Sequence, residues 1–234
     1  MGWIDTLLGR EIKLTETQRA RLASWRALRR SSVDADLDGS RFVVVDVETS
    51  GLNLARDRLI AIGAVAVVNG KIDLNDSFEV VLQQEVTSTK ENILIHGIGG
   101  GAQTAGQVPV EALLAFLEYL RKDPLVAFHV TFDETMLRRA IRRFLGFGFN
   151  HPWLDLAYAV PGLYPTLAGR FRALDHWLGY FNIRNYARHN ALADAVSTAQ
   201  LFMIAAKEAQ RKRILNYQGM QRVEKAQRWA SGEG

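Results

Sequence analysis

Asp46 and Glu48 end a run of apolar, mostly β-branched residues in the stretch FVVVDVETSGL. Because side chains alternate along a strand, the two carboxylates are expected on the same side, about 7 Å apart at ~3.3 Å per residue. Ionised carboxylates at an apolar strand end repel each other and are poorly solvated, and a divalent metal ion would resolve that conflict. An isolated pair of this kind more often only ends a strand in solvent before a turn, here Ser50-Gly51.

Two later stretches carry further acids. Asp133 opens a predicted helix directly after a buried strand in VAFHVTFD, and His189 precedes Asp194 by five residues in HNALAD, at the start of an alanine-rich helix. Each acid alone is most often a helix cap or a first-turn acid. The chain has no cysteine, which excludes a thiolate nucleophile and thiolate metal ligands, so any metal must bind through oxygen or imidazole.

Taken together, the stretches DVETSGL, FHVTFD and HNALADA resemble the three motifs of the DEDDh 3'-5' exonucleases, the family that includes the proofreading epsilon subunit of bacterial DNA polymerase III. The resemblance covers about residues 41–207 and includes ILIHGI at 93–98. One motif alone is weak, whereas the ordered set is specific. The sequence departs from the family at Phe128-His129, where the usual dipeptide is His-Asn, which concerns the surroundings of Asp133 and not that acid itself.

The resemblance implies a set of site residues and a cofactor. The expected ligands of two Mg²⁺ or Mn²⁺ ions are Asp46, Glu48, Asp133 and Asp194. One ion would activate the attacking water and the other would stabilise the leaving 3'-oxygen, with His189 taking the proton and a nucleoside 5'-monophosphate as product. The expected contacts to the terminal nucleotide are Thr49, Leu52 and Phe132, although ordinary core packing is an equal alternative for Leu52 and Phe132.

The other ionisable residues near these motifs are expected outside the chemistry. Asp155 follows a short strand and is predicted to cap a helix, while His151 and His176 have no ligand partner at useful spacing. His96 is expected at most to support the site. His129 lies on a predicted buried strand and is expected to hydrogen-bond near Asp133.

The elements that must position these residues form an α/β pattern. RFVVVDVE predicts a central strand, and a hairpin turned at Asn69-Gly70 follows it. Short strands are predicted in DPLVAFHV and HPWLDLAYAV, with helices between and after them. The resemblance makes this an RNase H-like mixed five-stranded sheet with helices on both faces.

Three segments are expected along the chain. Residues 1–40 contain an amphipathic helix, with Thr15 or Thr17 as cap and Leu22, Trp25 and Leu28 spaced three apart, followed by a polar linker. Residues 41–207 form the exonuclease domain, and 208–234 a basic tail. Trp3 and Trp25 are expected to pack on the domain or on a partner.

The partner expected from the resemblance is a single-stranded or frayed 3' end of DNA, with RNA equally open and a polymerase subunit as a further contact. The net charge is only +4 and supports this weakly. The longest apolar run, LIAIGAVAVV, is far short of the ~20 residues of a membrane helix, so a cytoplasmic protein without membrane contact is expected. The alternative from another class is an inactive RNase H-like module that binds nucleic acid or acts as a scaffold.

Overall fold

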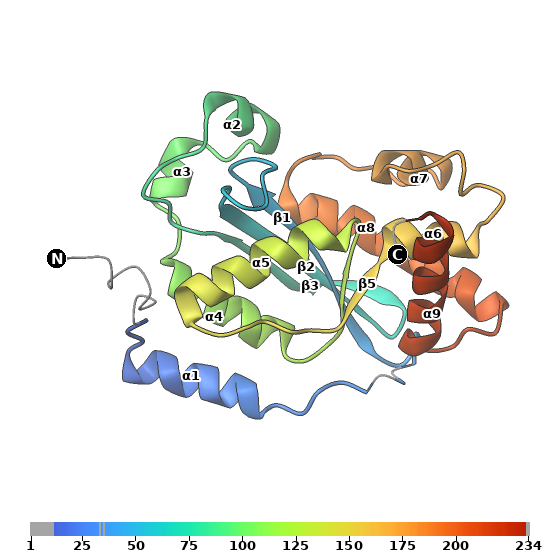
Figure 1. Cartoon of the computed structure of the whole chain (residues 1–234), viewed down its shortest axis with the longest axis horizontal. Coiled ribbons are helices and arrows are strands. Elements are labelled where there is room, and N and C mark those ends of the chain that lie inside the picture. The colour runs from blue at the N-terminus through green and yellow to red at the C-terminus, as the bar shows by residue number, and fades with distance from the viewer. Residues whose placement is uncertain (1–11, 33, 35, 233–234) are drawn as a thin grey trace.

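A computed structural model describes residues 12–32, 34 and 36–232 and contains one five-stranded sheet with the order β3-β2-β1-β4-β5 (Figure 1). The strands are β1 (Arg41–Thr49), β2 (Leu59–Val68), β3 (Lys71–Val81), β4 (Leu125–Ala127) and β5 (Trp153–Asp155). The pairs β1–β2 and β2–β3 are antiparallel, whereas β1–β4 and β4–β5 are parallel. The sheet is therefore mixed, and β1 is its central strand, as predicted.

The hairpin between β2 and β3 turns at the predicted dipeptide. Asn69 and Gly70 both have positive φ, 52° and 67°. A two-residue turn with positive φ at both positions matches the right-handed twist of the flanking strands, and Asn-Gly tolerates that conformation. The register Val68↔Lys71 then follows directly.

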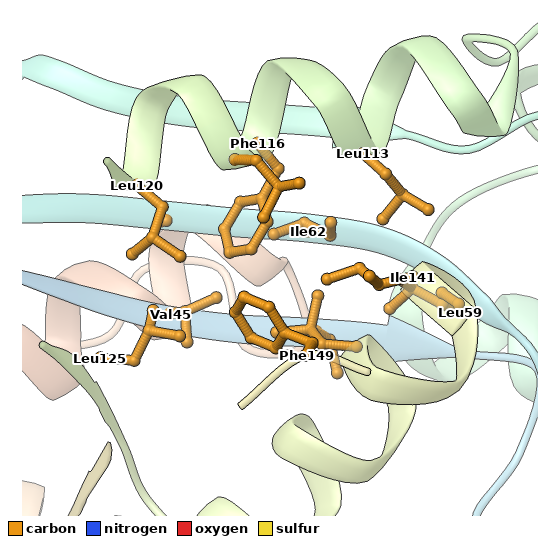
Figure 2. Close-up of a cluster of buried hydrophobic side chains, with 14 of the residues drawn as sticks. Val45, Leu59, Ile62, Leu113, Phe116, Leu120, Leu125, Ile141 and Phe149 are labelled. Atoms are coloured by element: carbon orange, nitrogen blue, oxygen red, sulfur yellow. The ribbon is translucent and has the colours of Figure 1, made fainter. Parts of the chain in front are cut away.

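Helices cover both faces of the sheet, and alternate β1 side chains enter two separate cores. One face carries α1 (Glu16–Ala27), α4 (Pro109–Leu120) and α5 (Val130–Leu145). The other carries α6 (Leu156–Leu163), α7 (Leu174–Tyr180), α8 (Ala191–Arg211) and α9 (Tyr217–Ala230). Short helices α2 (Lys90–His96) and α3 (Gly100–Thr104) connect β3 to α4. Figure 2 shows Val45, Phe116 and Phe149 in the first core.

Helix α1 packs on the domain. Thr15 caps it in a capping box with Gln18, and Leu22 and Trp25 are buried. The Trp25 indole donates a hydrogen bond to the carbonyl of Arg121 at 2.7 Å, so this tryptophan binds its own domain. The inward position predicted for Leu28 is wrong: it is the extended C-cap and is 45% exposed. Trp3 lies outside the described residues.

The segment expected as a basic tail is a folded helix. Helix α8 continues to Arg211, and after a short turn α9 packs against α6. Tyr217 and Met220 are buried, and the Tyr217 hydroxyl donates to the carbonyl of Trp153 at 2.8 Å. Apolar residues spaced three apart give α9 a buried face, which its basic composition concealed. No helix in the described ranges is long and apolar enough to span a membrane.

Candidate active site

The structure brings β1 and the first turn of α8 together at one point of the sheet. Asp46 and Glu48 lie opposite Gly63 and Ala61 of β2. A Cβ atom on Gly63 would lie 2.2 Å from backbone atoms at the start of α8, so only glycine permits this approach. The close crossing sets Asp194, in the first turn of α8, beside the two β1 acids.

Three of the four predicted metal ligands form one cluster. Asp46, Glu48 and Asp194 each offer a carboxylate oxygen within 4.8 Å of the others. Asp133, in the first turn of α5 and 5% exposed, is outside this group but close enough that its charge raises the pKa of Asp46. Carboxylate oxygens at this separation suit a hard divalent cation, so the residues present fit Mg²⁺ or Mn²⁺.

Burial and mutual repulsion raise the pKa of three of these acids, Asp46, Glu48 and Asp133. Burial raises the pKa of Glu48 to about 8, and the charge of Asp194 adds to that rise. Burial also raises the pKa of Asp133 to about 8, although backbone N–H groups, including that of Val47, oppose it. For Asp46 the pKa lies well above its usual range, first through burial and then through Asp133 and Asp194. A cation is therefore the natural means of ionising the cluster at neutral pH.

Within the described residues, Asp194 is the member of the cluster with several protein partners. Arg188 forms an ion pair with it at 2.6 Å, Asn185 donates to the same oxygen, and the His189 N–H donates to the other oxygen at 2.9 Å. Arg188 also pairs with Asp175 of α7 at 3.0 Å. The guanidinium lowers the pKa of both β1 acids and so partly offsets the repulsion. Sequence reasoning missed Arg188 and Asn185, and only their nearness to His189 marked them.

The two histidines beside the motif acids occupy similar backbone positions. His189 and His129 are both exposed, have positive φ of 61° and 67°, and lie at the start of a helix. The expected buried strand position of His129 is wrong, because β4 ends at Ala127. Its backbone N–H, not its imidazole, makes the supporting hydrogen bond, and the ring lies edge-on to Phe128.

The predicted nucleotide contacts fall into three different settings. The Thr49 hydroxyl donates to the carbonyl of Gly51 at 2.7 Å and shapes the loop after β1. Leu52 is 86% exposed, so core packing is excluded for it, whereas Phe132 is half-buried against the first core. His96 is buried, and its Nδ1 accepts the Ile98 N–H at 3.0 Å.

Asp155 is a helix cap, as predicted, and it caps two helices. Its carboxylate accepts the Ala157 N–H of α6 at 3.0 Å and the N–H groups of His129 and Val130 at the start of α5 at 2.9 and 3.1 Å. His151 lies away from the cluster: it stacks on Phe149 and bonds to a backbone carbonyl. The exposed His176 belongs to α7, and neither histidine joins a metal-binding group of the described residues.

A groove of about 680 Å³ runs beside α5, between that helix and the segments 57–59 and 83–86. Its apolar floor includes Leu59 and Met136. Four arginines line it: Arg58, Arg139, Arg142 and Arg143. Arg139 donates to the carbonyls of residues 54, 55 and 57 and so holds the loop that follows β1. The groove begins one helical turn beyond Asp133, and Asp57 and Glu85 also line it, so that four arginines face two acids.

Two bacterial proteins are similar in sequence to this chain. A PolC-type DNA polymerase III of Thermotoga petrophila is 30% identical over 176 residues, which are 75% of this chain and 12% of that protein. A DNA polymerase III subunit epsilon-like protein of Rhodobacter capsulatus is 31% identical over 172 residues, 73% of this chain and 24% of that protein. This chain thus spans less than a quarter of the length of these relatives.

Solved structures of E. coli Exonuclease I share the fold. The complex with a dT13 oligonucleotide superposes with a TM-score of 0.62 at 18% identity, over 74% of this chain and 42% of that one. The mixed sheet with helices on both faces is the RNase H-like fold predicted from the motifs. The family model described as exonuclease matches residues 43–202, which hold all four predicted acids and His189, and the chain therefore belongs to the exonuclease family.

Proposed function

We propose that this domain is a metal-dependent 3'-5' exonuclease that releases nucleoside 5'-monophosphates from the 3' ends of nucleic acids. The convergence of Asp46, Glu48 and Asp194 carries the proposal, because two separate sequence motifs bring three buried or half-buried acids within 4.8 Å of one another, where their charges repel. Asp133 adds a fourth carboxylate at the same end of the sheet. When bound, two divalent cations supply charge neutralisation and an activated water for attack on phosphorus.

The chain's own residues take three roles. The four acids hold the cations through oxygen atoms. His189, exposed beside Asp194, accepts the proton of the attacking water, a role suited to an imidazole near neutral pH. Leu52 presents an exposed apolar surface to the terminal base. Phe132, half-buried against the first core, is the second apolar contact to that base. The Thr49 hydroxyl donates to the carbonyl of Gly51 and so fixes the turn that leads to Leu52.

The substrate class proposed is a single-stranded or frayed 3' end. The related Exonuclease I was crystallised with a dT13 oligonucleotide, which supports a single-stranded ligand. The arginine-lined groove beside α5 lies where an upstream strand leaving the acids could run, and arginine contacts to phosphate need no particular base. The choice between DNA and RNA, contact with a polymerase subunit and a cytoplasmic location stay predictions.

An inactive binding or scaffolding module is the competing function. It would need neither four clustered acids, three of them with a raised pKa, nor a histidine beside them, because such a cluster destabilises a fold that never binds a cation. The retained cluster favours the enzyme.

Product analysis on 5'-labelled oligonucleotides tests the proposal. Single-stranded DNA and RNA of equal length are incubated with Mg²⁺, Mn²⁺ or EDTA. A labelled ladder that shortens from the 3' end, with the released unlabelled nucleoside 5'-monophosphates detected by chromatography, is expected only with metal. The Asp46→Asn variant is the matched control. A chain that binds these oligonucleotides in Mg²⁺ and Mn²⁺ but leaves both intact would be the scaffolding module instead.

A further inference from the structure

Asp155 connects the start of α5 to the C-terminal helix. It is 1% exposed, and its Oδ1 accepts N–H groups of His129 and Ala157, while Oδ2 accepts that of Val130. Arg228 of α9 donates to the same Oδ2 at 3.2 Å. The Asp155 carboxylate therefore accepts hydrogen bonds from residues of three helices, α5, α6 and α9.

The start of α5 depends on this carboxylate. Its N-cap, His129, makes no side-chain capping bond and holds a left-handed φ of 67°, which is unfavourable for a residue with a Cβ. The first N–H groups of a helix need acceptors, and a carboxylate there also matches the helix dipole. Asp155 supplies both, and Asp133 lies in the first turn that it fixes.

Helix α9 fixes Asp155 from two sides. Arg228 provides the countercharge to Asp155 and lies 4.0 Å from the centre of the Tyr158 ring. Glu224, one turn earlier on α9, accepts the backbone N–H of Asp155 at 3.2 Å and pairs with Arg228 at 3.3 Å. A buried carboxylate without its countercharge would shift or take up a proton. These contacts come from residues beyond the 43–202 matched by the family model.

Helix α9 packs so closely against α6 that a shift of one helix would move the other. A Cβ on Gly162 of α6 would lie 2.6 Å from Val223, so the two helices touch at a glycine. Tyr217 and Met220 of α9 are also buried. Packed interiors resist small shifts, and the Arg228 guanidinium is thereby held at a fixed place relative to β5.

We propose that α9 is a positioning element of the active site, in which Arg228 and Glu224 fix Asp155, and Asp155 fixes the first turn of α5 and with it Asp133. The expected effect of α9 on hydrolysis rests on the proposed function. Neither α9 residue touches substrate or metal. Groups that orient metal ligands in this way typically change metal affinity or activity by about 10- to 100-fold when removed.

The test uses the full chain and the variant Arg228→Gln. Mn²⁺ affinity measured by calorimetry should fall about 10-fold or more, and amide hydrogen exchange at residues 129–133 should accelerate. On an oligonucleotide, kcat should fall while KM changes little. Arg228→Lys should restore part of the loss, and Arg222→Gln, on the same helix but with its guanidinium donating to Gln218, should behave as wild type.

A double-mutant cycle separates positioning from general destabilisation. Asp155→Asn removes the charge that Arg228 serves, so Arg228→Gln should cost little more in that background. Additive losses of Mn²⁺ affinity in the double variant would overturn the proposal. Unchanged Mn²⁺ affinity and hydrogen exchange in Arg228→Gln would also overturn it, as would a change in KM with kcat unaltered. If Arg228→Gln does not fold, Glu224→Ala, which removes the acceptor of the Asp155 N–H, should lower Mn²⁺ affinity and accelerate exchange at residues 129–133 in the same way. Affinity and exchange are read without substrate, so they test the positioning even if the proposed activity fails.

Discussion

Replacing Glu48 by glutamine should stabilise the metal-free protein by an amount that grows between pH 5 and pH 8. Burial, and then Asp194, raise the pKa of this acid from 4.5 to about 8. Over that interval the folded chain holds a proton that the unfolded chain has released, so the free energy of unfolding falls as pH rises. A shift of about 3.5 pKa units at ~1.4 kcal/mol each sets an upper limit on the order of 5 kcal/mol, and relaxation reduces it to roughly 2–4.

Urea denaturation of wild type and Glu48→Gln in EDTA, at pH 5 and pH 8, measures this difference. Buried His151, whose pKa is lowered to about 4, contributes a slope of opposite sign below pH 6.5, but it is common to both proteins and cancels. Millimolar Mn²⁺ should offset most of the variant's advantage at pH 8, since a ligand at 100 times its Kd stabilises the folded state by about 2.7 kcal/mol. An advantage of the variant that is equal at both pH values would refute the reasoning.

Three further substitutions have definite expected outcomes. Asp46→Asn should abolish oligonucleotide hydrolysis with an unchanged circular dichroism spectrum, and a wild-type rate would reject the metal-site assignment. His189→Ala should lower kcat by about 10²–10⁴ and His129→Ala far less, while the reverse order would exclude His189 as general base. Gly63→Ala should cost about 1–3 kcal/mol in urea and weaken Mn²⁺ binding, whereas Gly148→Ala, with open space around it, should do neither.

The central strand and its hairpin were predictable because their signals are local, whereas the site acids were predicted only from the ordered set of motifs. An apolar run ending in Asp46 and Glu48 specifies a central strand, and Asn69-Gly70 specifies the hairpin that folds back on it. Capping by Thr15 and the helical spacing of Leu22 and Trp25 likewise need only neighbouring residues.

The contacts that the sequence concealed are long-range. Asp155 and Arg228 are 73 residues apart, and nothing near either one indicates the other. The close approach of α8 to Gly63 depends on two elements separated by most of the domain. In α9 the basic residues dominate the composition, so the buried face formed by Tyr217 and Met220 was overlooked. Composition describes the solvent side of such a helix, and packing decides whether it folds.

The buried acids of this domain differ in which groups donate hydrogen bonds to their carboxylates. That difference distinguishes the structural acid from the acids of the site. Asp155 is at least as buried as the cluster, yet backbone donors and Arg228 satisfy its carboxylate completely. Asp46 and Glu48 receive no hydrogen bond from the described part of the chain, and only burial and other charges act on the pKa of each. A fold able to bring three helices to one aspartate could have done so for these two. Carboxylates left without protein donors at an apolar strand end stay protonated unless a cation binds them, and this is the physical reason to propose Asp46 and Glu48 as metal ligands and Asp155 as part of the structure that positions them.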